Sequence, residues 1–177
     1  AADQDGNLGM LVNTFDESTG VTAYELLTLN TSGKTVGEPL VLAFDEGFYP
    51  TSMIFAKDGS LCFNGQKDKA CILVMDKDGQ KLFEIVDDSL GGFLYKDGDK
   101  IYCDAWEETN GVYKPEFYEI LVPEKKLGEA IDMTAFIDGN ISAGFDGLYL
   151  SDSYGVYKMD LKAGQKTEVF EYDQADA

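Results

Sequence analysis

Hydrophobic and polar residues alternate in short runs along the whole chain, and tight-turn dipeptides separate the runs. The alternation is clearest near the C-terminus, where Tyr157, Met159 and Leu161 alternate with Lys158 and Asp160. A period of two is typical of a strand with one buried face. No stretch places apolar residues at helical spacing over more than two turns. The pattern therefore predicts an all-β protein.

The alternating runs are grouped into a repeating unit of two hairpins. An Asp-Gly turn opens each unit, for example at 58–59 and 146–147, and a second turn rich in Gly or Lys follows, for example at 78–81 and 163–166. The units recur at intervals of about 40 to 46 residues, which is the length of one four-stranded propeller blade. We therefore expect a β-propeller-like array of about four four-stranded antiparallel blades, which is either cut from a larger propeller or closed with the help of another segment or copy.

The repeat divides the chain into blades within one domain, residues 1–177. Leu26, Ile72, Ile120 and Tyr157 are expected to be buried on the third strands. The predicted blades are 1–48, 49–89, 90–138 and 139–177.

The first blade is expected to lack its innermost strand. Its strands are predicted near 8–15, 21–30 and 35–44, which leaves one sheet edge without a partner. Unpaired edges promote strand addition, so we expect self-association through open sheet edges unless another segment covers this one.

Charge and composition exclude several functions. The formal net charge is −19, all 14 cationic residues are lysines, and there is no histidine. This balance disfavours nucleic acids and anionic membrane surfaces. The missing histidine removes Ser-His-Asp and Cys-His catalysis and the commonest zinc ligand. No apolar run has the length of a membrane span, so no direct membrane insertion is expected.

The sequence predicts neither a metal site nor a cofactor. Cys62, Cys71 and Cys103 have no metal-binding spacing, and two alternatives stay open, a Cys62–Cys71 disulfide or reduced thiols in the core. The segment 76–79 has part of a calcium-loop pattern but lacks its outer acidic positions. We interpret it as an Asp-Gly turn.

Acidic and aromatic residues gather in the loops at one predicted end of the blades, whereas lysines such as Lys81 and Lys166 are assigned to the other end. Rings beside carboxylates suit sugars, peptides or cationic ligands. The alternative is that the rings plug the ends of the core. The predicted ligand-binding residues are Tyr49, Trp106, Tyr113, Tyr154, Asp45, Asp88 and Asp152.

The last unit carries a family resemblance. The segments 141–150, 155–161 and 162–167 resemble propeller repeats that precede the binding lobes of large extracellular solute-binding lipoproteins in Gram-positive anaerobic bacteria. The resemblance implies an extracellular or cell-surface protein of an ABC import system, tethered to the membrane, with the propeller as an accessory recognition module.

Two classes of function follow from these observations. The first is a noncatalytic module that binds a small molecule, a carbohydrate or a protein partner, and we expect no enzymatic activity. The second is a carbohydrate-active propeller enzyme that uses paired carboxylates about 5 to 10 Å apart. A purely structural spacer is a third alternative.

Overall fold

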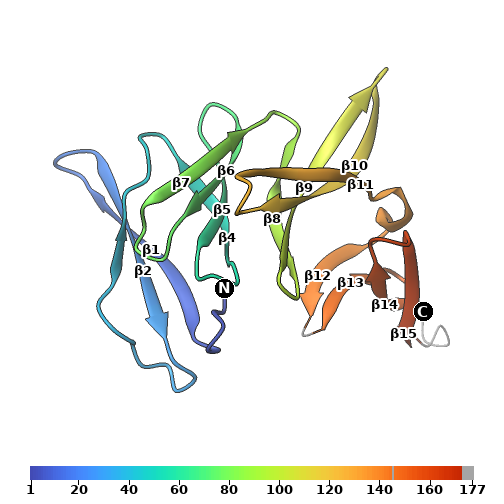
Figure 1. The fold of residues 1–177 in the computed structure, drawn as a ribbon, viewed down its shortest axis with the longest axis horizontal. Coiled ribbons are helices and arrows are strands. Elements are labelled where there is room, and N and C mark those ends of the chain that lie inside the picture. The colour runs from blue at the N-terminus through green and yellow to red at the C-terminus, as the bar shows by residue number, and fades with distance from the viewer. Residues whose placement is uncertain (145, 173–177) are drawn as a thin grey trace. The chain divides into compact units, whose positions relative to one another are not determined.

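The fold is all-β, as the alternation predicts, and consists of blade-like antiparallel sheets. The computed structural model describes residues 1–144 and 146–172 (Figure 1). The chain forms two compact units, Ala1–Asp88 and Ser89–Ala177. Among the described residues no helix is long and apolar enough to cross a membrane.

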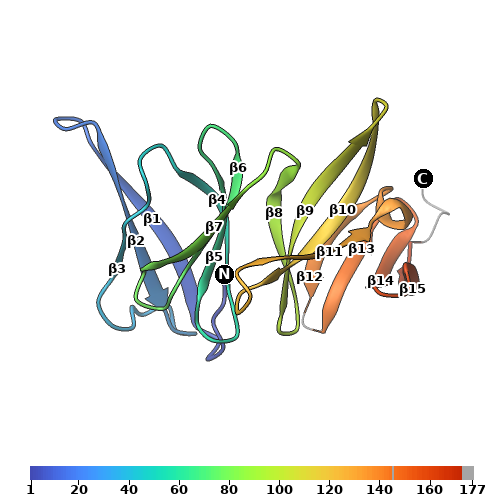
Figure 2. The same ribbon diagram turned by 45° about the horizontal axis from the view of Figure 1, so that its top comes forward.

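The first unit contains a three-stranded and a four-stranded sheet, each a simple up-and-down meander (Figure 2). The three-stranded sheet confirms that the first blade lacks a strand. Its strands are β1 (Leu8–Asp16), β2 (Val21–Leu29) and β3 (Leu40–Leu42), and the second sheet holds β4 (Tyr49–Phe55), β5 (Leu61–Gln66), β6 (Ala70–Met75) and β7 (Lys81–Val86).

The second unit contains two four-stranded meanders joined by a short 3₁₀ helix, η1 (Thr134–Phe136). The strands of the first are β8 (Leu90–Asp97), β9 (Lys100–Thr109), β10 (Val112–Leu121) and β11 (Lys126–Asp132), and those of the second are β12 (Asn140–Gly144), β13 (Gly147–Ser151), β14 (Gly155–Asp160) and β15 (Gln165–Glu171).

The repeated turns are closed by side chains that bind backbone amides. Asp76 accepts hydrogen bonds from the N–H groups of Asp78 at 2.9 Å and Gln80 at 2.8 Å. Gly79 has a φ of 77°, a value that glycine reaches without steric cost. The same pair of bonds forms at Asn30. These carboxylates and amides serve the turns, which confirms the turn interpretation of 76–79.

The core of the first unit lies between its two sheets. Phe55 packs its ring against Gly9 of β1, where a Cβ atom would lie 2.5 Å from ring carbons. Glycine therefore allows the sheets to approach at this point. The buried residues of this core are Leu26, Leu42, Phe48, Phe55, Leu61, Phe63, Cys71, Leu73 and Met75.

In the second unit, Phe117 of β10 is the centre of an aromatic stack. Its ring lies 4.8 Å from that of Tyr95 and 6.2 Å from that of Tyr102, both nearly parallel to it. Phe136 of η1 and Leu150 of β13 belong to the same buried cluster. The sheet β8–β11 and the sheet β12–β15 thus share one core.

The three cysteines are buried thiols, and none of them forms a disulfide bond. Cys62 pairs with Val74 across β5 and β6, whereas Cys71 pairs with Gly65, so the two cysteines are offset along the strands. The disulfide alternative is therefore wrong and the reduced-thiol alternative is observed. Burial raises the pKa of Cys103 to about 12, as expected for an inert core thiol.

The N-terminal residues cover only the start of the open edge of β1. The Gly9 N–H donates to the Ala1 carbonyl at 2.6 Å, and the Ala1 amino group donates to the Gly9 carbonyl at 3.0 Å. Within the described chain, no strand pairs with this edge beyond Gly9. Self-association through the edge stays a prediction.

The third-strand residues are mostly buried as predicted. Leu26, Ile72 and Ile120 are buried, whereas Tyr157 is half-buried. The Lys166 ammonium lies 4.2 Å from the centre of the Tyr157 ring, which keeps that ring at the sheet surface.

Replacement of Ile72 by alanine should lower the free energy of unfolding by ~2 to 5 kcal/mol, because the side chain is fully buried on β6. Urea denaturation followed by circular dichroism would measure this. Val41→Ala is the control: Val41 is 65% exposed, so its loss should cost less than ~0.5 kcal/mol. Equal effects for the two variants would contradict the register.

Candidate functional site

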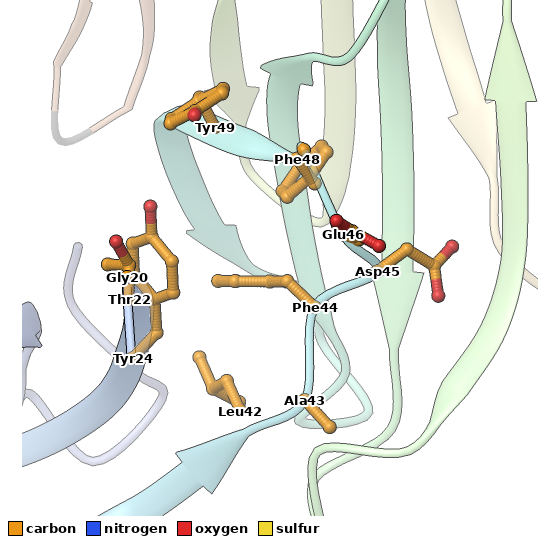
Figure 3. Close-up of a pocket in the computed structure, with 11 residues that line it drawn as sticks. Gly20, Thr22, Tyr24, Leu42, Ala43, Phe44, Asp45, Glu46, Phe48 and Tyr49 are labelled. Atoms are coloured by element: carbon orange, nitrogen blue, oxygen red, sulfur yellow. The ribbon is translucent and has the colours of Figure 1, made fainter. Parts of the chain in front are cut away.

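A pocket of about 570 Å³ opens in the first unit beside the segment that joins β3 to β4 (Figure 3). This volume is within the range of small-molecule sites. The lining residues come from β2 and its preceding turn, from β3, from the β3–β4 connection and from the first residue of β4. They are Gly20, Thr22, Tyr24, Leu42, Ala43, Phe44, Asp45, Glu46, Gly47, Phe48 and Tyr49.

Aromatic rings form one wall of the pocket. Phe44 projects toward Tyr24 of β2, and their ring centres are 4.9 Å apart with an interplanar angle of 72° (Figure 3). Phe44 also contacts Phe48 and Phe63, each at 5.0 Å. Phe63 is fully buried, so the wall is continuous with the core and is rigidly placed.

Gly65 of β5 is the residue against which the Phe48 ring of this wall packs. A Cβ atom at Gly65 would lie 2.5 Å from the ring of Phe48 and 2.6 Å from the carbonyl oxygen of Tyr49. The ring and the start of β4 therefore approach the β5 backbone more closely than any other residue type would permit. This contact fixes Phe48 and Tyr49 relative to the sheet.

Asp45 anchors the connection through an alternating cluster of four charges. Lys67 lies 2.8 Å from Asp45 and 3.1 Å from Glu84, and Lys81 lies 2.9 Å from Asp45 and 2.5 Å from Glu84. Hydrogen bonds from the two lysines lower the pKa of Asp45 to about 2. Asp45 points away from Phe44 in Figure 3, so its carboxylate holds the loop.

The predicted separation of charge between the two ends is wrong at two places. Lys81 binds Asp45, and Lys166 binds Asp152 at 3.0 Å, although each lysine was assigned to the end opposite its partner. Lysine has a long flexible side chain that reaches along the sheet to a carboxylate at some distance from its own Cα atom.

Two of the predicted site residues, Asp45 and Tyr49, meet at the pocket. The remaining five lie elsewhere. The core-plug alternative is correct for Phe48, which is 3% exposed, but not for the predicted rings. Tyr49 is 64% exposed, Tyr113 and Tyr154 are each 63% exposed, and Trp106 is 48% exposed.

Trp106 and Tyr113 belong to a long hairpin, whereas a loop was expected between them. Strands β9 and β10 continue side by side to a two-residue turn at Asn110 and Gly111 (Figure 2). Both turn residues have positive φ, 54° and 77°, as this tight hairpin turn requires. The Asn-Gly dipeptide is a strong hairpin signal that the sequence interpretation missed.

Asp152 and Tyr154 occupy the turn between β13 and β14. Asp152 accepts hydrogen bonds from the N–H groups of Tyr154 at 2.8 Å and Gly155 at 3.1 Å. These bonds make Asp152 a cap of the turn, and its side chain is only 7% exposed. Asp88 pairs with Lys69 at 2.6 Å, with both side chains exposed.

The pocket residues that the sequence interpretation left out of the predicted site include Tyr24, Phe44 and Glu46. Tyr24 lies in a strand and gives no signal of its own. The segment 44–49 does give one, since it places three aromatic rings around two adjacent acids within six residues. Burial, together with nearby Tyr49, raises the pKa of Tyr24 above its ordinary value.

Asp104 of β9 is a half-buried carboxylate with a structural role. Burial raises its pKa, and its Oδ1 atom accepts the N–H of Phe93 at 2.9 Å. It thereby binds the irregular start of β8, where the pairing with β9 shifts in register. Within the described part of the chain, no group of three or more acidic, histidine or cysteine side chains is placed to hold a metal.

Comparison with known proteins gives a likeness in fold. A search of protein families found no match, and a search of curated proteins found none either. A gluconolactonase from Xanthomonas campestris, XC5397, superposes with a TM-score of 0.51 at 16% identity over 90% of this chain. A protein of unknown function from Bacteroides caccae superposes with a TM-score of 0.44 at 12% identity over 83% of it.

The fold is of the β-propeller type. The gluconolactonase likeness and the succession of up-and-down antiparallel sheets both support this assignment. The chain spans 60% of the length of the Xanthomonas protein and 55% of that of the Bacteroides protein.

The pKa of Asp45 should be near 2 by NMR titration, compared with an ordinary value of 3.8. Because the folded-state pKa is the lower one, the charge cluster should stabilise the fold above about pH 4 and lose this effect as the pH falls toward about 2. The double variant Lys67→Met, Lys81→Met should return the pKa toward 3.8. Lys69→Met is the control, and it should leave the pKa of Asp45 unchanged.

Gly65→Ala should lower the free energy of unfolding by ~1 to 3 kcal/mol, because the added methyl group overlaps the Phe48 ring and the Tyr49 carbonyl. Gly92→Ala is a matched control, since a Cβ atom there meets no atom within 4 Å; its effect should stay within ~0.5 kcal/mol. Thermal unfolding of both variants would compare them. If Gly65→Ala leaves the free energy of unfolding unchanged, Phe48 does not pack against Gly65 as described.

Proposed function

We propose that this chain is a noncatalytic ligand-binding module of the propeller type, and that its site is the pocket formed by Tyr24, Phe44 and Tyr49. The observation that carries the proposal is the exposed Tyr49 ring, which lines the pocket together with the half-buried rings of Tyr24 and Phe44. Large rings left open beside a concave surface are typical of binding sites. The wall is anchored in the core and by the Asp45 cluster, so the pocket is preformed.

The lining supports a small molecule or a carbohydrate as the ligand. Phe44 and Tyr49 provide apolar surface, while Thr22 and the tyrosine hydroxyls offer hydrogen-bonding groups. A ligand with an apolar face and a few polar groups fits this combination.

The cellular setting in the proposal is extracytoplasmic. It rests on the resemblance of residues 141–167 to the propeller repeats of extracellular solute-binding lipoproteins. In such a protein the module would be accessory to an ABC importer and would recognise a solute or a partner protein near the membrane.

The proposal is noncatalytic because the carboxylates with the clearest environments have structural partners. Asp45 is bound by two lysines, Asp104 by backbone N–H groups, and Asp152 by its own turn. The gluconolactonase activity belongs to the Xanthomonas protein, with which the likeness is one of fold.

The test is a ligand screen on the full chain by NMR, with neutral oligosaccharides, amino acids, amines and short peptides. At least one class should bind saturably and shift the amide resonances of residues 44–49. Tyr49→Ala should weaken that ligand by about 2- to 30-fold, since loss of one stacking ring has this effect. Because Tyr49 is exposed, Tyr49→Ala should change the free energy of unfolding little.

Tyr154→Ala and Trp106→Ala are the controls, because both rings are exposed but lie outside the pocket. Neither should change the affinity. If these variants weaken binding and Tyr49→Ala does not, the site has been misplaced. Consumption of an added sugar or lactone would contradict the noncatalytic assignment, and a screen without any binder would favour the spacer alternative.

A further inference from the structure

The charges around the pocket are of one sign. Among its described lining residues, Asp45 and Glu46 carry negative charge and none carries a positive charge. Lys67 and Lys81 are bound to Asp45 and Glu84 in the cluster. Within the described chain, no lysine pairs with Glu46, whose side chain is exposed. The two lysines therefore compensate Asp45, and Glu46 gives the pocket lining one negative charge that no described lysine pairs with.

The aromatic wall offers a second attraction for positive charge. The rings of Tyr24 and Phe44 are inclined by 72°, and those of Phe44 and Phe48 by 51°. Phe48 is buried in these contacts, whereas Tyr24 and Phe44 stay half-buried at the pocket, and the face of an aromatic ring carries the negative part of its quadrupole. Tyr49 adds an exposed ring, which lies above Tyr24 and Phe44 in Figure 3.

Tyr24 also stays neutral. Burial and the neighbouring Tyr49 raise the pKa of Tyr24, so its hydroxyl group keeps its proton at physiological pH. Neutral rings with a nearby unpaired carboxylate are the combination that favours a bulky, weakly hydrated cation over a small metal ion, which requires several oxygen ligands.

From these observations we infer that the pocket binds an organic cation, a quaternary or protonated amine carried on a larger molecule. The inference rests on the proposed function and specifies the ligand class of the same site. The cationic head lies against Tyr24, Phe44 and Tyr49, with Glu46 as its counter-charge. The volume of about 570 Å³ leaves room for the rest of the molecule.

A pair of probes with one shape and different charge tests the inference on the full chain. Choline carries a trimethylammonium group, and 3,3-dimethylbutan-1-ol carries the same group with carbon in place of the charged nitrogen. Choline should shift the amide resonances of residues 44–49 saturably and bind about 2- to 30-fold more tightly than the neutral alcohol. Methyl glucoside is a third probe, for a neutral sugar.

Two variants separate the contributions of ring and charge. Tyr49→Leu should weaken choline by about 2- to 30-fold. Glu46→Gln keeps the shape of the side chain, and it should weaken choline by about 2- to 5-fold and reduce the salt dependence of binding. Tyr113→Leu and Glu108→Gln are matched controls on the β9–β10 hairpin, exposed like the test residues, and should change nothing.

The outcomes distinguish this inference from the proposed function. Equal affinity for choline and the neutral alcohol, or binding of the glucoside alone, would overturn the cation assignment while the pocket stands as a binding site. An unchanged choline affinity in both Tyr49→Leu and Glu46→Gln would place the cation elsewhere. If no probe perturbs residues 44–49, and the broader ligand screen finds no binder there, the proposed function fails as well.

Discussion

The close contact between aromatic rings and glycines is the constraint on which the first unit depends. Phe55 lies against Gly9 of the neighbouring sheet, and Phe48 lies against Gly65 beside the start of β4. A ring can approach the backbone this closely only where no Cβ atom intervenes. The contact of Phe55 with Gly9 determines how closely the two sheets pack. The contact of Phe48 with Gly65 determines where the β3–β4 connection ends and β4 begins. The aromatic wall of the pocket follows from both, because Phe44 packs between Tyr24, Phe48 and Phe63.

Charge has a second, local role in this strongly acidic chain. With a net charge of −19, the carboxylates repel one another on average, and ion pairs with lysines relieve this repulsion at particular places. At the pocket, Lys67 and Lys81 bind Asp45 and Glu84, which ties the connection to β7 and to the β5–β6 turn. Because Lys67 and Lys81 are both bound in this cluster, no lysine among the described residues pairs with Glu46. Asp45 thus holds the β3–β4 connection in place, and Glu46 provides the negative charge of the pocket.

The candidate site was only partly predictable from the sequence. Asp45 and Tyr49 were found because they stand in a predicted loop, where side chains serve neither a strand face nor a turn. Tyr24 was missed because its position in β2 reads as an ordinary strand residue, and only the packing of β2 against the β3–β4 connection gives it a second role. Trp106 and Tyr113 were assigned to a loop because the Asn110-Gly111 turn was overlooked, and with it the hairpin that carries them.

The sequence by itself determined the local structure. Period-two alternation, Asp-Gly turns and glycines at positive φ specify strands and hairpins through contacts between residues close in the chain. These signals placed β1 and β2 correctly, whereas the strand predicted near 35–44 forms only over Leu40–Leu42. Tertiary structure decided which long side chains meet, as Lys81 with Asp45 and Lys166 with Asp152, and which rings are buried, as Phe48 but not Tyr49. These outcomes depend on the distance between sheets and on the reach of flexible side chains. Neither quantity is encoded in the spacing of residues along the chain.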